Sequence, residues 1–279
     1  MKNLRTKLDI IRRTRVALTT ALSLLVCSPS FATKTPNLDS INERGTLRVG
    51  MSTFVPWAMR NKQGDLIGFE IDVAKRLAKD SGWKVEFVPT AWDGIIPALL
   101  AKKFDVIIGG MSVTPERSKS ILFSDPYSHS GVQLAASKEL ADGFSSLADF
   151  NSRRVKIAAR RGAYTVQVAR ETFPKAKILQ FDDDAQAFQE VLNGNAHAVI
   201  ASSPKPEFET IKNSDHLFLP FGQRLSKGNE AFAMRLGESD KQDFFNQWIA
   251  ERTKDGWLEE RYEYWFSTLD WQNQTIISQ

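Results

Sequence analysis

Cysteine, histidine and long apolar runs are scarce in this sequence of 279 residues, and each scarcity excludes a class of protein. The one cysteine, Cys27, leaves no pair for a disulfide framework. The three histidines, His129, His197 and His216, lack the spacing of a zinc site or of a base paired with a nucleophile. After residue 32, no apolar run approaches the about 20 residues of a membrane-spanning helix. We therefore expect a globular protein with no metal and no other cofactor.

The excess of positive charge lies in the first 32 residues. They hold six lysines and arginines against one aspartate, so the overall charge of +4 leaves about −1 for the rest of the chain. Their basic opening, the apolar stretch Val16–Val26 and the small residues Ser30 and Ala32 are typical of a secretory signal peptide. We expect residues 1–32 to be removed after Ala32 and the protein to be exported. The nearly neutral remainder gives no reason to expect nucleic-acid binding.

Residues 45–126 alternate between expected strands and helices. The strands are expected at 46–51, 83–88 and 104–108, and the helices at 68–81 and 95–102. Apolar residues recur at helical spacing in the first helix and at every second position in the second strand. This alternation predicts a parallel sheet covered by helices, in which ligands bind at the carboxyl ends of the strands.

Two of the loops at that end carry aromatic residues. Phe54 and Trp57 lie on either side of Pro56 in the loop at 52–57, and Trp92 lies in the loop at 90–94. Rings at the ends of strands either stack on a ligand or cover the core, and the sequence leaves both open.

The third loop, at 109–117, combines several groups that bind anions. It offers flexible backbone at Gly110, a hydroxyl at Ser112 and a guanidinium at Arg117. Together these groups suit a carboxylate. An ordinary strand–turn–helix corner has the same residue types, so this local pattern alone does not decide between the two.

A second alternating block spans residues 132–225. Its strands are expected at 131–136, 154–159, 177–181 and 196–201, and its helices at 165–172 and 184–193. The chain then returns through a strand at 231–234 and helical segments at 240–254 and 258–266. Residues 33–44 are predicted to be a mobile N-terminal segment and residues 269–279 a C-terminal tail. Two α/β lobes with a late crossing back are the architecture that this order predicts.

Several motifs recur here in a familiar order: Gly68–Asp72, Trp92–Leu99, Asp105–Gly110, Thr114–Arg117, Phe123–Tyr127, and the closing Asp255–Trp257 and Tyr264–Phe266. Together they resemble the periplasmic solute-binding proteins of ABC importers, amino-acid-binding branch (bacterial extracellular solute-binding protein family 3). The resemblance covers essentially the whole chain after the leader.

The resemblance implies an α/β, two-lobe periplasmic-binding-protein fold, in which each lobe is a mainly parallel sheet flanked by helices. Lobe 1 would comprise 45–126 and 231–268, lobe 2 would comprise 132–225, and two hinge strands would cross at 127–131 and 226–230. It further implies a monomer in the periplasm that captures an amino acid or related small carboxylate between its lobes. An ABC permease in the inner membrane would receive the solute.

The resemblance also assigns residues to the ligand site. Phe54 and Trp92 match aromatics that enclose the ligand, and Gly110, Ser112 and Arg117 match an amide, a hydroxyl and a guanidinium on its carboxylate. From lobe 2, Arg161, Gly162 and Thr165 match the loop and helix N-terminus facing the ligand, where free amides favour an anion. The expected substrate-binding set is Phe54, Trp92, Gly110, Ser112, Arg117, Arg161, Gly162, Thr165 and Ser202.

Three positions depart from the family pattern. Ser202 stands where an aspartate usually holds the ligand's α-amino group, and Met51 stands where many members have another acid. Because a buried ammonium without a carboxylate is unfavourable, either Glu230 supplies the charge or the ligand is not a simple α-amino acid. Arg160 and Arg161 form a pair where one polar residue is common. A second cation suits an acidic ligand, but we expect one of the two to point to solvent.

The main alternative is an enzyme, because cyclohexadienyl dehydratases share this fold. Their chemistry needs a positioned acid or base, and no histidine is paired for that role. The run Asp182–Asp184 is interpreted as the cap of the next helix rather than as a cation site. We therefore expect a binding protein without catalytic residues, with the dehydratase as the alternative.

Overall fold

The computed structural model describes residues 38–275. The predicted signal peptide, residues 33–37 and residues 276–279 lie outside the described residues. In the described part the strands of the main sheet pair in the order β4-β1-β5-β11-β6-β9-β7-β8, and β10 pairs with β6. The strands are β1 (Thr46–Met51), β2 (Met59–Arg60), β3 (Leu66–Ile67), β4 (Lys84–Pro89), β5 (Val106–Ile107), β6 (Ile121–Ser137), β7 (Lys156–Arg160), β8 (Lys177–Phe181), β9 (Ala198–Ser202), β10 (Leu217–Phe218) and β11 (Ser226–Arg235).

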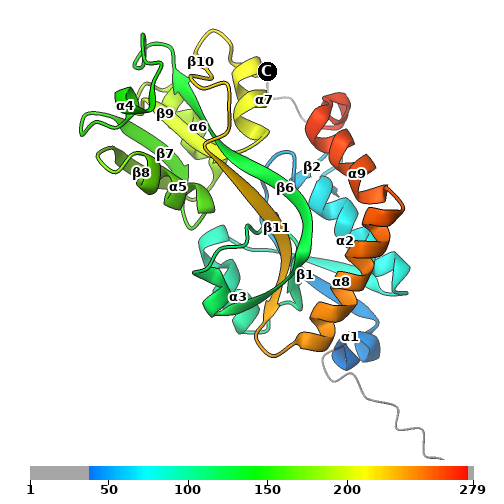
Figure 1. The fold of residues 1–279 in the computed structure, drawn as a ribbon. Coiled ribbons are helices and arrows are strands. Elements are labelled where there is room, and N and C mark those ends of the chain that lie inside the picture. Colours follow the sequence, from blue (N-terminus) through cyan, green and yellow to red (C-terminus); the bar gives the residue numbers. More distant parts are fainter. Residues whose placement is uncertain (1–37, 276–279) are drawn as a thin grey trace, which may run out of the picture. The chain divides into compact units, whose positions relative to one another are not determined.

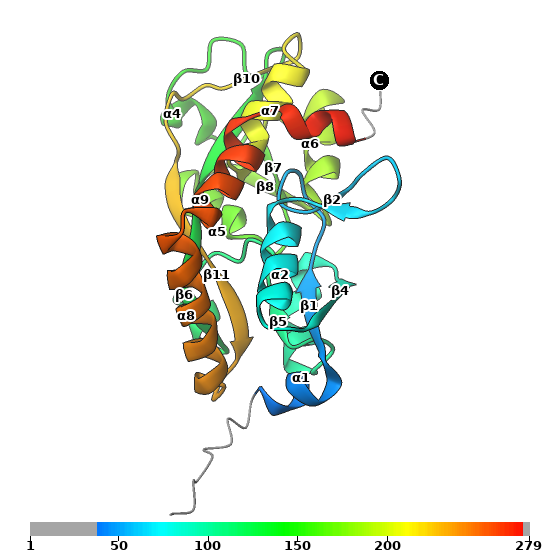
Figure 2. The same ribbon diagram turned by 90° about the vertical axis from the view of Figure 1, so that its right-hand side faces the viewer.

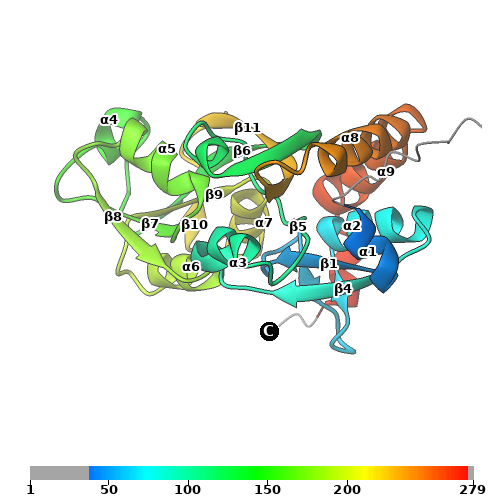
Figure 3. The same ribbon diagram turned by 90° about the horizontal axis from the view of Figure 1, so that it is seen from below.

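The helices divide between two lobes, as the alternating pattern predicts. They are α1 (Asp39–Arg44), α2 (Phe69–Asp80), α3 (Ile95–Leu100), α4 (Leu147–Phe150), α5 (Tyr164–Thr172), α6 (Asp184–Leu192), α7 (Lys205–Lys212), α8 (Ser239–Lys254) and α9 (Trp257–Tyr262), with short turns η1 (Trp92–Gly94), η2 (Arg117–Lys119), η3 (Glu263–Ser267) and η4 (Asp270–Gln274). In lobe 1, β1 pairs in parallel with β4 and β5. In lobe 2, β7 pairs in parallel with β8 and β9 (Figures 1 and 3).

Two long antiparallel strands, β6 and β11, connect the lobes. Their register runs from Ser226 opposite Val132 to Arg235 opposite Ile121, with shifts on both sides of Ala231. The predicted strand at 131–136 is the second half of β6. The sequence does not predict its first half because Pro126 normally interrupts a ladder, and here Pro126 lies at the shifted pairing with Ala231.

Each lobe has its own hydrophobic core. Lobe 1 buries a large aromatic cluster between its sheet and helices α2, α8 and α9, including Trp57, Phe69, Phe232, Phe245 and Phe266. Helix α8 packs along β6, and α9 continues beside α2 (Figure 2). Lobe 2 has a smaller cluster around Phe150, Ile157, Phe173 and Ile200. The two cores hold the strand ends of both lobes around one cleft.

Two segments at the ends of the chain differ from the expectation. Residues 39–44, within the predicted mobile segment, form α1, which buries Ile41 completely and ends at Gly45 with φ of 64°. In the predicted tail, η4 buries Trp271 against Phe208 of α7, with 5.7 Å between ring centroids. One or two apolar residues in a polar stretch give too weak a periodic signal to predict either contact.

Candidate ligand-binding cleft

Seven of the nine predicted site residues line one cavity between the lobes. From lobe 1 come Phe54, Trp92, Gly110, Ser112 and Arg117, and from lobe 2 come Thr165 and Ser202; the lining also includes Arg160, Ala163, Tyr164 and Asp184. We call this cavity the cleft. The lobe 1 residues follow β1, β4 and β5, and the lobe 2 residues lie at the ends of β7 and β9 or in the first turns of α5 and α6. The carboxyl ends of parallel strands therefore meet here, as in other α/β proteins.

Arg117 spans the cleft from its position in η2. Its Nη1 donates to the carbonyl of Ser112 at 2.8 Å, and its Nη2 donates to the carbonyl of Gly162 in lobe 2 at 3.1 Å. Burial lowers the pKa of Arg117 to about 10. Within residues 38–275, no aspartate or glutamate forms an ion pair with this guanidinium. A partly buried cation without a carboxylate partner is suited to an anionic ligand.

Only glycine fits at position 110, because of its backbone conformation and because of the side chains around it. Its φ is +66°, and a Cβ there would lie 3.0 Å from the Phe54 ring and 3.2 Å from Trp57. The amide of Gly110 donates to the Tyr127 hydroxyl at 3.3 Å, a long hydrogen bond. The amide that the resemblance assigns to a ligand carboxylate thus already has a weak partner inside lobe 1.

Arg160 and Arg161 have different surroundings, because Arg160 is the last residue of β7 and Arg161 is the first residue of the turn that follows. Arg160 is 4% exposed and lines the cleft, where its guanidinium donates to the Ser52 hydroxyl of lobe 1. Arg161 is exposed and pairs with Asp182, Nη1 to Oδ1, at 3.1 Å. Of the predicted set, Arg161 and Gly162 do not line the cleft. The sequence predicts that one of the two arginines points to solvent and places Arg161 in the site, whereas the arginine that lines the cleft is Arg160.

Burial lowers the pKa of Arg160, and aspartates nearby, Asp184 first among them, oppose that shift. Its guanidinium lies 5.1 Å from the Trp92 ring and 5.5 Å from the Phe54 ring. At these distances a guanidinium is attracted to the ring faces. The two aromatics predicted to enclose a ligand therefore also contact a cation of the protein.

The acids near the cleft differ from the expectation. Glu230 does not line the cleft; its carboxylate accepts from Ser128 and Ser130 between the crossing strands, and burial raises its pKa to about 7. Met51 is buried in the lobe 1 core. The carboxylate that does line the cleft belongs to Asp184, which sequence reasoning missed.

The aspartates at the start of α6 have different roles. Asp183 is the helix cap, as predicted, and accepts from the amide of Gln186 at 2.8 Å. Asp184, one residue on, is 8% exposed, and burial raises its pKa while Arg160 and Lys205 lower it. Because α6 begins at the edge of the cleft, its first residue, Asp184, points into the cleft. A capping pattern in the sequence does not predict this orientation.

A buried acid–phenol pair lies beneath the lobe 1 face. Tyr127 donates to Oε2 of Glu70 at 2.5 Å, and both side chains are buried. Burial raises the pKa of Glu70 to about 8 and raises that of Tyr127 well above its usual value. The hydrogen bond from Gly110 to the same phenol connects this pair to the cleft.

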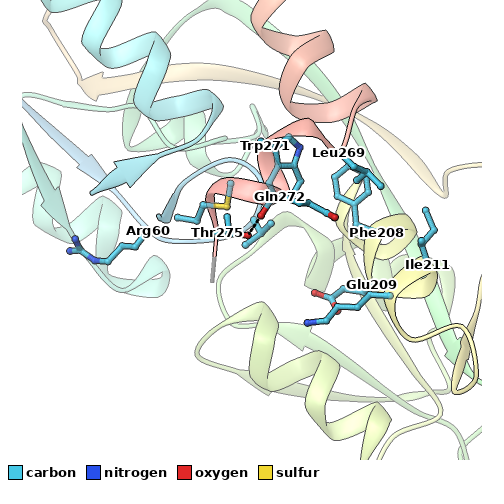
Figure 4. A pocket seen from close by; sticks show the side chains of 11 residues that line it. Arg60, Phe208, Glu209, Ile211, Leu269, Trp271, Gln272 and Thr275 are labelled. Atoms are coloured by element: carbon cyan, nitrogen blue, oxygen red, sulfur yellow. Dashed lines mark hydrogen bonds between the residues drawn. The ribbon is translucent and has the colours of Figure 1, made fainter. Parts of the chain in front are cut away.

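A second cavity lies away from the strand ends. Figure 4 shows side chains of α7 and of the C-terminal segment around it, including Phe208, Ile211, Leu269 and Trp271. Its lining is largely apolar, and its charged groups, such as Arg60 and Glu209, lie at opposite sides in the view (Figure 4). Its third charged residue is Lys212, so it holds one acid and two basic residues, and none of the predicted site residues lines it.

Among the described residues, no three His, Cys, Asp or Glu side chains come together as a metal site. Over the same part of the chain, no helix has the length and apolar character needed to cross a bilayer.

The chain matches the bacterial extracellular solute-binding proteins, family 3, over residues 47–268. It belongs to this family. It is 30% identical to the L-cystine-binding protein TcyJ of Escherichia coli K12 over 230 residues, which covers 82% of this chain and 85% of the relative. It is also 26% identical over 242 residues to the cyclohexadienyl dehydratase of Pseudomonas aeruginosa, covering 86% of this chain and 90% of the relative.

Solved structures confirm the predicted fold class. The ancestral amino acid-binding protein AncCDT-1, a precursor of cyclohexadienyl dehydratase, superposes with a TM-score of 0.75 at 43% identity, covering 82% of this chain and 98% of that one. A second structure of AncCDT-1 is described as a cationic amino acid solute-binding protein. This chain is therefore a two-lobe solute-binding protein of the ABC transporter class, and the predicted family is confirmed.

Proposed function

We propose that this protein captures an amino acid or related small carboxylate in the periplasm and delivers it, as a monomer, to an ABC permease in the inner membrane. The signal peptide predicted at 1–32 would direct its export. In this proposal Arg117 and Ser112 hold the carboxylate of the solute, and Phe54 and Trp92 enclose the rest. Amino-acid-binding relatives such as TcyJ support the class of ligand.

The partly buried guanidinium of Arg117 carries this proposal. It lies in the cleft with carbonyl partners but, among residues 38–275, no carboxylate partner. The Thr165 hydroxyl also lines the cleft and is buried without a hydrogen-bond partner in the described part of the chain. Because buried polar groups are normally hydrogen-bonded, these two groups together favour a ligand rich in acceptor oxygens.

Contacts across the cleft explain how binding couples to closure. Arg117 of lobe 1 bonds to Gly162 of lobe 2, and Arg160 of lobe 2 bonds to Ser52 of lobe 1. A solute that contacts both lobes stabilises the arrangement that contains these bonds over one in which the lobes are apart. The permease would then recognise the closed form.

A dehydratase is the second candidate, favoured by one relative and by Asp184, a carboxyl of raised pKa in the cleft. We prefer binding without chemistry. The three histidines lie outside the cleft lining, and the buried acids Glu70 and Glu230 also lie outside it. Incubation with prephenate or arogenate decides between the two, since measurable turnover would establish an enzyme.

The test of the binding proposal is a thermal-shift screen of amino acids and dicarboxylates, followed by calorimetric titration of each hit. A bound ligand raises the melting temperature. We expect Arg117→Ala to weaken binding of every hit by about 2–5 kcal/mol, because the ligand carboxylate is left unpaired. Arg161→Ala is the matched control, because it removes the same charge outside the cleft. Equal affinities of the two variants would refute the role of Arg117.

A further inference from the structure

The charges of the cleft lining do not balance. Two guanidiniums, the partly buried one of Arg117 and the buried one of Arg160, line the cleft with one carboxylate, from Asp184. Lys205, near Asp184, is already paired with Glu209 at 2.7 Å and does not line the cleft. A solute that matches this lining brings one more negative charge than positive, because uncompensated buried charge is unfavourable.

Arg160 is built to receive an acceptor from the cleft. It is 96% buried, and its Nε has no hydrogen-bond partner among residues 38–275. One Nη donates a hydrogen bond to the Ser52 hydroxyl, and no acid of the described chain forms an ion pair with the Arg160 guanidinium. A guanidinium presents its donors in a plane that matches the two oxygens of a carboxylate.

The position of Arg160 also disfavours cationic solutes. Its guanidinium lies between 5 and 6 Å from the centroids of both Trp92 and Phe54. An ammonium or guanidinium of a solute placed against those same rings would meet this like charge in a low-dielectric setting. The rings therefore enclose a solute whose far end is anionic or neutral.

Asp184 is the counterpart for an ammonium group. It lines the cleft, is 92% buried, and forms no hydrogen bond or ion pair through its carboxylate with any described residue. Glu230, the other candidate from the sequence, is turned toward Ser128 and Ser130. The acid missing at Ser202 is thus replaced within the same cavity by one from the start of α6.

We infer that the solute is an amino dicarboxylate: Arg117 holds one carboxylate, Arg160 the second, and Asp184 the ammonium. This inference rests on the proposed function and narrows its ligand class. It separates this chain from AncCDT-1, the relative described as binding cationic amino acids. Arg160 is then the residue that determines specificity.

The first experiment measures affinities by calorimetry for L-aspartate, L-glutamate and L-2-aminoadipate, for the amides L-asparagine and L-glutamine, and for L-lysine and L-arginine. We expect the best acid to bind roughly 10- to 100-fold more tightly than its amide, the usual range for one charge-assisted hydrogen bond. Lysine and arginine should bind most weakly.

The second experiment repeats the titrations with variants. Arg160→Met keeps an apolar stem against the rings and should reduce the preference for glutamate over glutamine to about one, whereas Arg160→Lys should retain part of it. Arg161→Met is the control for charge. Asp184→Asn should lower the affinity for glutamate roughly tenfold or more, and Asp182→Asn is the control variant. Melting curves verify that each variant folds.

The outcomes separate the two proposals. If lysine or arginine binds more tightly than every acid, the present inference fails while capture of an amino acid stands. If an acid binds but the Arg160→Met variant still prefers that acid over its amide, the assignment of Arg160 is wrong. If no member of the panel binds, the inference fails, and the proposed function then depends on the wider thermal-shift screen.

Discussion

The lobe 1 face of the cleft rests on stacked aromatic rings, whereas the lobe 2 face presents charged side chains with few partners of their own. Phe54 stacks on Trp57 with 5.4 Å between centroids and 19° between planes, and Trp57 packs on Phe266 at 4.5 Å. Across the cleft, Arg160 lies over the lobe 1 rings of Phe54 and Trp92, and the carboxylate of Asp184 has no hydrogen-bond partner among the described residues. The lobe 1 face, which also carries Arg117, therefore rests on packed rings, whereas the lobe 2 face contributes Arg160 and Asp184.

This difference indicates an order of events in binding. A surface held by packed rings is present before the solute arrives and needs little reorganisation. The interactions between the charged groups of lobe 2 and the solute become strongest when the lobes close and water leaves, because electrostatic interactions strengthen in a low dielectric. The solute would therefore contact lobe 1 first, and its charge would decide whether lobe 2 follows.

The largest effect expected is from removal of the ring beneath the lobe 1 face. Trp57 is 1% exposed, so Trp57→Ala should lower the free energy of unfolding by about 3–5 kcal/mol, the range for large aromatic truncations in cores. Tyr164→Ala, on the half-buried lobe 2 face, should lower it much less. Urea unfolding measures both. Similar losses would mean that the two faces are equally supported.

The next effect concerns the buried acid beneath the same face. Burial raises the pKa of Glu70 from 4.5 to about 8, so the folded state holds its proton more tightly than the unfolded state does. Stability contributed by this group is complete below about pH 4.5 and falls as the pH rises toward 8. Glu70→Gln keeps the shape without the charge and should flatten this slope, by on the order of a few kcal/mol at pH 8.

The control for this prediction is Glu116→Gln, since Glu116 is exposed and pairs only with Lys119. Unfolding is followed by urea titration at a series of pH values from 4 to 9. A wild-type slope that Glu70→Gln leaves unchanged would show that Glu70 is ionised in the folded protein, and would place the pH dependence elsewhere.

A smaller effect distinguishes the two acids that precede α6 in lobe 2, Asp182 and Asp183. Asp183→Ala removes the cap of the helix and should lower the free energy of unfolding by about 1 kcal/mol. Asp182→Ala removes only an exposed pair with Arg161 and should change it by less than about 0.5 kcal/mol. Denaturation at pH 7 measures both. Equal losses would show that the exposed pair stabilises this end of the helix as much as the cap does.

The same comparison explains what the sequence could predict. The lobe 1 groups Gly110, Ser112 and Arg117 lie in one continuous stretch after a strand, so their convergence follows from local pattern. In lobe 2 the choice between Arg160 and Arg161 depends on the register of a strand, and a shift of one residue reverses the faces. Register is fixed by pairing with other strands, which no local pattern contains.

Asp184 illustrates a different limit. An acidic run before a helix predicts a cap, and Asp183 fulfils that role. Which of its neighbours turns inward depends on where the helix lies relative to the other lobe, a tertiary property. The first half of β6 was missed for a similar reason, because only the irregular pairing with β11 accommodates Pro126.

The smallest effect tests the bond by which lobe 2 reaches lobe 1. Ser52→Ala removes the acceptor of Arg160 and leaves the packing of the lobe 1 face intact. One net hydrogen bond is worth about 0.5–1.5 kcal/mol, so affinity for the solute should fall roughly two- to tenfold with little change in stability. The exposed neighbour Thr53 provides the control variant, Thr53→Ala. Titration with the best solute and small-angle scattering with and without it report affinity and closure. If Ser52→Ala behaves as the control does, Arg160 does not hold the lobes together and acts on the solute alone.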